Sequence, residues 1–89
     1  MDKLEFIERN WKNIEFGLDL KIYEDENGNP GRQYLTDVGY IDLLTTDKSG
    51  NFYVIELKKG HTSDKVIGQT LSYIGWVRKH LAKGKRVYN

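Results

Sequence analysis

The sequence predicts one α/β domain spanning residues 1–89, with an antiparallel β-hairpin between two helices that lie near the ends of the chain. Apolar residues recur at three- and four-residue intervals over 3–16 and 63–83, which is the spacing of amphipathic helices. Runs rich in β-branched and aromatic residues occupy 38–46 and 52–58, as expected of strands. No repeat or long linker divides the chain, and 89 residues suit a single domain.

The first part of the chain holds the first predicted helix and two shorter strands. Asp2 followed three residues later by Glu5 resembles a capping box, and this helix is expected to end before Gly17. Residues 18–22 alternate apolar and polar side chains, which predicts a half-buried strand. After a turn rich in Asn and Gly, a second strand is expected to begin near Tyr34.

The hairpin and the second helix follow from turn and cap signals. The sequence Asp-Lys-Ser-Gly-Asn between the two long strands suits a type I turn with Gly50 in the left-handed region and Asp47 paired with Asn51. The second helix is expected to start at a run of Thr, Ser and Asp and to end at Gly84. Residues 85–89 can then begin a further strand.

Composition excludes several classes of protein. The chain has no Cys, so a disulfide framework and a thiolate zinc site are both excluded. It is 38% hydrophobic and 12% aromatic, which is too rich in core-forming residues for a disordered chain. No segment approaches the roughly 18 apolar residues that cross a bilayer, and no apolar run follows Met1. We therefore expect a cytoplasmic domain with no membrane association.

Charge is divided unevenly along the chain, although the net charge is only +1. Residues 1–56 carry six Lys or Arg against twelve Asp or Glu, whereas residues 57–89 carry eight against one. Such a division can present a basic face to a polyanion such as nucleic acid. The alternative is a solvated helix surface whose lysines confer only solubility, and charge by itself favours that alternative slightly.

Two carboxylates are expected to face each other across the hairpin. The predicted turn pairs Thr46 with Phe52, and continuing this register places Asp42 opposite Glu56. Directly opposed residues have Cβ atoms about 5 Å apart, and like charges at that separation repel by roughly 3 kcal/mol at an effective dielectric of about 20. Stability alone does not favour such a pair, so the acids point to a functional site.

A divalent cation would remove this repulsion, because Mg²⁺ is held by one or two carboxylates together with water and phosphate oxygens. Strand alternation puts Lys58 on the same face as Glu56, while Ile55 and Leu57 are expected to point into the core. The alternative is a surface salt bridge worth about 0 to 1 kcal/mol. That alternative is weakened because both acids lie within apolar strands. A two-residue loop would instead put the acids on opposite faces.

Three motifs follow one another along the chain. They are Gly39-Tyr40-Ile41-Asp42-Leu43-Leu44, then Phe52-Tyr53-Val54-Ile55-Glu56-Leu57-Lys58-Lys59-Gly60, then Gly68-Gln69 followed by Tyr73. In this order they resemble the PD-(D/E)xK nuclease superfamily, and most of all the catalytic domain of archaeal NucS/EndoMS-type endonucleases. The resemblance covers nearly the whole chain. It implies a restriction-endonuclease-like core with a mixed sheet, DNA as substrate, and hydrolysis of phosphodiester bonds that depends on Mg²⁺ or Mn²⁺.

The resemblance also implies roles for individual residues of the hairpin. Asp42 and Glu56 would bind the metal, with the main-chain carbonyl of Leu57 as a further ligand. Lys58 would orient or activate the attacking water.

Residues of both predicted helices would complete the catalytic site. Gln69 and Tyr73 lie four residues apart and would line it, although packing against the sheet is an equal alternative for Tyr73 and the favoured one for Trp76. The resemblance implies an acid on the first helix near the metal, where Glu5 fits best and Glu8 is the second choice. The alternative for either acid is simple solvation.

Basic residues are expected to contact the nucleic acid. Arg32, Lys59, Lys65 and Arg78 would bind phosphates, which gives affinity and salt dependence without sequence choice. His61, in the loop before the second helix, could approach a phosphate, but a lone loop histidine is more often only solvated.

Three departures limit the resemblance. Ile41 stands where the superfamily name has Pro, and we expect no counterpart of the N-terminal DNA-binding domain of NucS-type proteins, so a mismatch preference does not transfer. Relatives continue into a further strand, whereas this chain is expected to be truncated after the second helix. The open sheet edge would invite a second copy, so we expect a homodimer.

The sequence as a whole predicts a metal-dependent endonuclease that hydrolyses DNA through a metal-activated water. The alternative is a non-catalytic nucleic-acid-binding or assembly module that keeps a nuclease-like fold. Neither a Gly-rich phosphate loop nor a Ser-His-Asp arrangement is visible, so we expect no nucleotide cofactor and no covalent catalysis.

Overall fold

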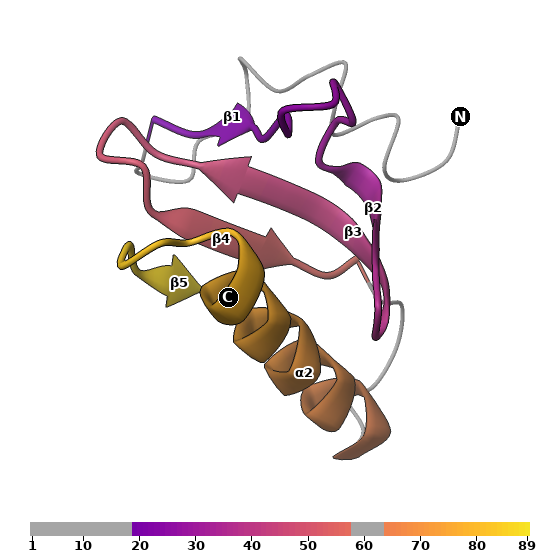
Figure 1. The fold of residues 1–89 in the computed structure, drawn as a ribbon. Coiled ribbons are helices and arrows are strands. Elements are labelled where there is room, and N and C mark those ends of the chain that lie inside the picture. The colour runs from indigo at the N-terminus through magenta and orange to yellow at the C-terminus, as the bar shows by residue number, and fades with distance from the viewer. Residues whose placement is uncertain (1–18, 58–63) are drawn as a thin grey trace.

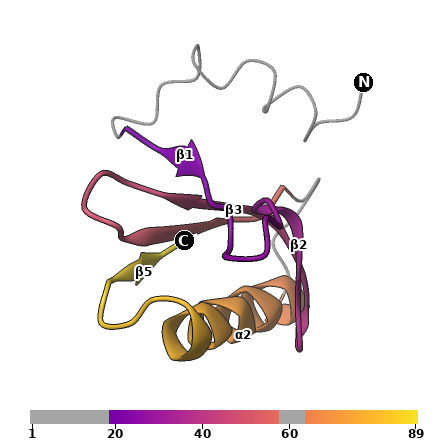
Figure 2. The ribbon, with the colours of Figure 1, turned by 45° about the horizontal axis from the view of Figure 1, so that its top comes forward.

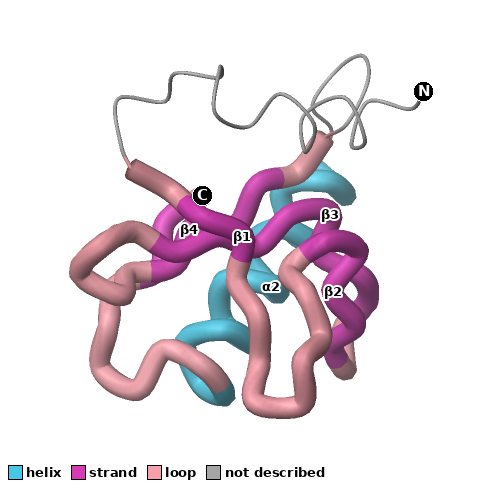
Figure 3. Tube along the Cα trace, turned by 90° about the horizontal axis from the view of Figure 1, so that it is seen from above, coloured by secondary structure: helices cyan, strands magenta, loops and turns pink. Residues whose placement is uncertain are grey.

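A computed structural model describes residues 19–57 and 64–89 as a mixed five-stranded sheet with one helix against one face (Figures 1 and 2). Seen from above, the strands lie over the helix (Figure 3). The elements are β1 (Lys21–Ile22), β2 (Arg32–Thr36), β3 (Gly39–Thr46), β4 (Phe52–Ile55), α2 (Asp64–His80) and β5 (Val87–Tyr88). The predicted α/β class and mixed sheet are confirmed. The described residues contain one helix rather than two, and the helix predicted at 3–16 lies outside them.

β3 is the central strand of the sheet. β4 pairs with it in the antiparallel sense on one side, and β1 and β2 are both antiparallel to it as well. The main-chain groups of Leu44 show that β1 and β2 share one edge of β3: its N–H donates to the carbonyl of Gly31 (2.6 Å), and its carbonyl accepts from the N–H of Tyr23 (3.0 Å). β1 and β2 therefore form one interrupted strand around a turn.

The sheet continues beyond the helix, so the expected truncation after the second helix is wrong. Val87 and Tyr88 pair in parallel with Phe52 and Tyr53 of β4. Two further hydrogen bonds hold this strand in place: the N–H of Arg86 donates to the side-chain oxygen of Asn51 (3.0 Å), and the N–H of Phe52 donates to the carbonyl of Arg86 (2.8 Å). The last strand is thus fixed to the hairpin turn as well as to β4.

α2 ends at His80, three residues before the predicted end. Lys83 and Gly84 both take positive φ values, of 47° and 89°, which an α-helix does not accommodate. The N–H groups of Leu81 and Ala82 both donate to the carbonyl of Val77 and close the last turn. Among the described residues, no helix is long and apolar enough to cross a membrane.

Two turns of the sheet are built in the same way around an aspartate. In residues 25–29 and 47–51, the first Asp accepts main-chain N–H bonds from the third and fifth residues and a side-chain bond from the final Asn. The fourth residue of each turn is a Gly at positive φ, 83° for Gly28 and 86° for Gly50. The predicted turn geometry of the hairpin is confirmed, including its pairing of Asp47 with Asn51.

A tyrosine completes each turn. The hydroxyl of Tyr34 donates to Asp25 (2.9 Å) and that of Tyr53 donates to Asp47 (3.0 Å). For Asp25, the N–H of Asn29 is the largest cause of a lowered pKa. For Asp47, desolvation is the largest influence and opposes ionisation, but the hydrogen bonds together still lower its pKa.

The core lies between α2 and the sheet. Tyr73 and Val77 of α2 pack against buried residues of four other segments, which are Tyr34, Ile41, Leu44, Phe52, Val54 and Ala82. Ile41 and Leu44 both join this core, although an odd separation puts residues of an ideal strand on opposite faces, so β3 departs from regular alternation between them. Ile67 and Leu71 remain about half exposed or more, so only part of the apolar stripe of α2 is used.

Gly31 lies where the interrupted edge strand approaches β3 most closely. A Cβ added at this position would overlap the carbonyl oxygen of Leu44, which is main chain and is held in the sheet. The close approach requires glycine for reasons of space, and this is the position at which the turn after β1 re-enters the sheet.

We expect Gly31→Ala to destabilise the domain by about 1 to 3 kcal/mol, because the added methyl group forces β2 away from β3. Urea denaturation followed by circular dichroism measures the change. Gly75→Ala is the matched control: nothing lies within 4 Å of its added Cβ on α2, so it should stabilise by roughly 0.5 to 1 kcal/mol. Equal effects of the two substitutions would contradict the steric explanation.

We also expect acid to weaken the fold through the two aspartate turns. Both folded-state pKa values lie below the unfolded value of about 3.9, so the carboxylates contribute stability above that pH and lose it as the pH falls through the folded pKa. The free energy of unfolding, measured in urea, should fall as the pH drops below about 4. A double variant with Asp25→Asn and Asp47→Asn should show a flatter decline, and an unchanged decline would rule out these turns as its cause.

Candidate active site

The hairpin register predicted from the sequence brings the two acidic positions to the same end of the strand pair. Thr46 pairs with Phe52 and Leu44 with Val54, as expected, and the last pair joins Leu43 to Ile55. Beyond this pair, the N–H of Leu57 donates to Oδ2 of Asp42 at 2.8 Å. A side-chain bond therefore continues the contact between the strands where the main-chain ladder stops.

Asp42 and Glu56 are both withdrawn from solvent. Each residue is half-buried, and both carboxylate oxygens of Glu56 are buried. Burying a charge costs folding free energy unless other groups compensate it. Two acids at this end of the hairpin therefore require such compensation.

Tyr73 of α2 reaches the same place from the other layer. It is 2% exposed, and its pKa is raised by burial first, then by the negative charge of Glu56 and then by that of Asp42. The charges of both carboxylates thus act on one phenol, which relates Tyr73 of the helix layer to the two acids of the hairpin.

Gly39 makes room for that phenol. Its φ is 126°, and a Cβ added there would lie 2.9 Å from the hydroxyl oxygen of Tyr73. The sequence motif contains this glycine, but sequence reasoning assigned it no role. Gly39 lies three residues before Asp42 at the start of a strand, and a glycine within a strand often marks a close approach of another part of the chain. This was the sequence signal that could have revealed its role.

The carboxylate pair fits a hard divalent cation. Mg²⁺ and Mn²⁺ prefer oxygen ligands, and Mg²⁺ is commonly held by one or two carboxylates with water and phosphate oxygens completing the shell. Within 19–57 and 64–89, no three His, Cys, Asp or Glu side chains gather in a way that could hold a metal ion. Asp42 and Glu56 would therefore be the side-chain ligands among these residues. The role expected of the Leu57 carbonyl stays a prediction.

The other predicted site residues that the structure describes lie on α2, where they are exposed, and on β2, where the residue is half-buried. Gln69 is exposed on α2, four residues from buried Tyr73, and Lys65 and Arg78 of the same helix are also exposed. Arg32 is half-buried on β2, where it pairs with Leu43, the neighbour of Asp42.

Several predicted site residues fall on parts of the chain that the structure does not describe. They are Glu5, Glu8, Lys58, Lys59 and His61. Their proximity to the two carboxylates stays a prediction.

The expectation that Ile55 and Leu57 point into the core is wrong. Both are half-buried and lie outside the core beneath α2, whereas Phe52 and Val54 belong to it. Since side chains alternate along a strand, Glu56 shares the face of Val54, which is the face that α2 covers. The Glu56 carboxylate therefore lies in the layer between sheet and helix, which explains its effect on the pKa of Tyr73.

Trp76 links α2 to the tip of the β2–β3 hairpin. Its indole N–H donates to Oδ2 of Asp37 at 3.2 Å, and its ring packs against Tyr34 and against the ring of His80. The favoured prediction of a packing role is confirmed. The bond to Asp37 was not predicted, because nothing in the sequence relates residues 39 positions apart.

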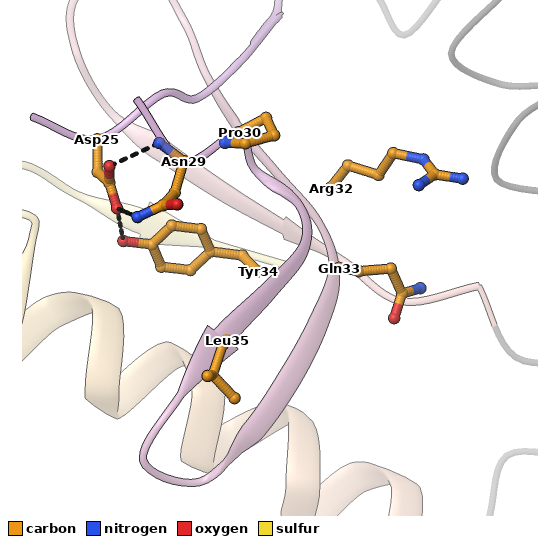
Figure 4. A pocket seen from close by; sticks show the side chains of 7 residues that line it. All are labelled: Asp25, Asn29, Pro30, Arg32, Gln33, Tyr34 and Leu35. Carbon is orange, nitrogen blue, oxygen red and sulfur yellow. Dashed lines mark hydrogen bonds between the residues drawn. The ribbon is translucent and has the colours of Figure 1, made fainter. Parts of the chain in front are cut away.

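A pocket of about 310 Å³ lies beside β2 (Figure 4). Its polar lining does not converge on one point: Asn29 and Tyr34 both donate to Asp25, while Arg32 and Gln33 extend away from them. This pocket therefore offers no second candidate for the chemistry.

Comparison with known proteins places these features in a family. Residues 19–87 match the family described as the endonuclease NucS C-terminal domain. Endonuclease NucS of Sulfolobus acidocaldarius is 32% identical over 78 residues, which cover 88% of this chain and 28% of that protein. The chain thus spans little more than a quarter of the length of this curated relative. No solved structure matches the chain. The match over most of the described residues shows that the chain belongs to the family of endonuclease NucS C-terminal domains.

Proposed function

We propose that this domain is a metal-dependent endonuclease that hydrolyses phosphodiester bonds in DNA. The observation that carries the proposal is the pair of withdrawn carboxylates, Asp42 and Glu56, which both act on Tyr73 between sheet and helix. Membership of an endonuclease domain family supports the same reaction class. The choice of DNA as substrate rests on the resemblance of the three sequence motifs.

In this proposal, Asp42 and Glu56 hold Mg²⁺ or Mn²⁺. The metal, when bound, supplies a Lewis acid at the phosphate and a more acidic water. The N–H of Leu57 holds Oδ2 of Asp42, which orients that carboxylate toward the end of the hairpin. Tyr73 is neutral at pH 7, because the pKa of a tyrosine is ordinarily about 10 and that of Tyr73 is raised further, so it adds no third negative charge beside the two acids.

The remaining proposed roles concern the water and the scissile phosphate. Lys58 would orient the attacking water and oppose the negative charge that develops on the phosphate. Gln69 can donate from its amide to a phosphate oxygen, and its exposure on α2 leaves it accessible to a bound strand. Glu5 would contribute an acid near the metal.

We expect Asp42→Asn and Glu56→Gln each to abolish cutting of plasmid DNA in Mg²⁺ or Mn²⁺, because each removes one carboxylate of the pair. Gel electrophoresis with and without EDTA measures cutting. A binding module that does not cleave would leave the plasmid intact under all conditions. Glu26→Gln, at an exposed acid of the first turn, is the control and should cut normally. Persistent cutting by both site variants would contradict the proposal.

Metal binding can be followed without catalysis. At a concentration ten times its Kd, a cation that binds only the folded chain stabilises it by about 1.4 kcal/mol. Thermal unfolding of the parent should therefore shift upward with Mn²⁺, whereas Glu56→Gln should show little shift. Equal shifts in both proteins would place the ion elsewhere.

We further propose that the domain forms a homodimer. Among the described residues, β5 pairs with β4 alone, and the free side of an edge strand is a template for another chain. Size-exclusion chromatography with light scattering at micromolar concentration should give about twice the chain mass of 10.4 kDa. The mass of a single chain would refute the dimer, and it would not contradict the proposed hydrolysis.

A further inference from the structure

The C-terminal part of the chain carries cations that the proposed active site does not use. Residues 65–89 contain six Lys or Arg and no Asp or Glu. Three of the six, Lys83, Lys85 and Arg86, lie beyond the end of α2 in the turn that leads to β5, and all three are exposed. Attraction to the negative end of the helix acts within its last turn, so it accounts for Arg78 and Lys79 but not for these three.

The turn that carries these cations is held by specific contacts. Lys83 and Gly84 adopt positive φ, and the N–H of Lys85 donates to the carbonyl of Ala82 at 2.9 Å. The N–H of Arg86 donates to the side-chain oxygen of Asn51, and the carbonyl of Arg86 accepts from the N–H of Phe52. A surface whose main chain is already ordered loses less conformational entropy on binding than one on a loose segment.

Aromatic rings lie beside the cations. Tyr88 is 38% exposed and stacks on Tyr53, with ring centroids 5.0 Å apart and planes inclined by 26°. The guanidinium of Arg86 donates to the Tyr88 hydroxyl at 3.4 Å. Cations interleaved with an exposed aromatic ring are the combination that nucleic-acid surfaces use, because phosphates meet the charges and bases or sugars meet the ring.

The acid of the adjoining hairpin turn does not neutralise this surface. Asp47, on the adjoining turn, accepts hydrogen bonds from Ser49, Asn51 and Tyr53. In the part of the chain that the structure describes, no salt bridge joins Lys83, Lys85 or Arg86 to a carboxylate, whereas Lys48 of the same turn is ion-paired with Asp19 at 2.9 Å. The charge of the β5 turn is therefore available to a ligand.

The β5 turn lies at the opposite end of β4 from Glu56. Figures 1 and 2 both show it beside the β3–β4 turn, away from the β2–β3 hairpin. From Phe52, which bonds to Arg86, to Glu56 is a rise of about 13 Å at roughly 3.3 Å per residue. Phosphates of one B-DNA strand advance about 3.4 Å per base pair, so this span corresponds to about four base pairs.

We propose that Lys83, Lys85, Arg86 and Tyr88 form a second contact surface for the substrate, which binds the DNA backbone about four base pairs from the scissile phosphate. The cations bind phosphate oxygens, and Tyr88 contacts a base or sugar of the same strand. This inference rests on the proposed function, since it measures the position of the second surface from a scissile phosphate held at Asp42 and Glu56.

The test is equilibrium binding of a fluorescein-labelled DNA duplex of about 20 base pairs, and of its single strand, by the full chain in EDTA. The double variant Lys83→Gln/Lys85→Gln should bind at least about tenfold more weakly at low salt. Its plot of log affinity against log salt should be less steep by up to about 1.8, since each phosphate contact contributes about 0.9. Tyr88→Leu should weaken binding of the single strand at an unchanged slope.

The matched control is Lys21→Gln/Lys48→Gln, which removes the same charge from an exposed strand position and from an ion-paired one. It should bind as the parent does. Circular dichroism checks folding, and the single variant Lys85→Glu gives the same test if the double variant does not fold. Binding by the Lys83/Lys85 variant with parental affinity and slope would overturn the surface, as would a parent that does not bind DNA. Cutting with Mn²⁺ is measured separately, so either result leaves the proposed function to its own test.

Discussion

The insertion of Tyr73 between α2 and the sheet is the contact on which the rest of the site depends. The phenol is 2% exposed, and its hydroxyl lies against the position where Gly39 has no side chain. It also lies close enough to Asp42 and Glu56 for both to raise its pKa. A larger residue at position 39 would move the ring, and the same movement would alter the surroundings of both carboxylates. Core packing and the electrostatics of the site are therefore not separable in this domain.

Burial of the acids explains how so small a domain can hold them in place. A half-buried carboxylate that accepts a main-chain N–H, as Asp42 accepts that of Leu57, is held in a fixed direction by the backbone itself. The neutral phenol adds shape and excludes water without adding charge. Such an arrangement costs folding free energy when empty and is compensated when a cation binds, which is the balance expected of a metal-binding site.

The hairpin and its acids could be predicted from the sequence because they depend on local signals. Gly50 within Asp-Lys-Ser-Gly-Asn determined the turn type, the turn determined the register, and the register brought Asp42 to Glu56. The face of the sheet could not be predicted in this way. Both faces of the strands are buried, since Leu43 and Thr45 are fully buried as well as Leu44 and Val54, so alternation alone does not say which face the helix covers. The Trp76–Asp37 bond and the parallel pairing of β5 are long-range contacts and leave no mark in the local pattern.

The two aspartate turns have a consequence for where cations bind. The chain carries many acids, and several are exposed, so other carboxylates compete with the hairpin end for a cation. Asp25 and Asp47 are removed from that competition, because their lone pairs already receive main-chain, amide and phenol donors. A cation that bound Asp25 or Asp47 would have to break the hydrogen bonds that form one of these turns. The hydrogen bonds of the two turns thus keep Asp25 and Asp47 from competing with the hairpin end for a cation.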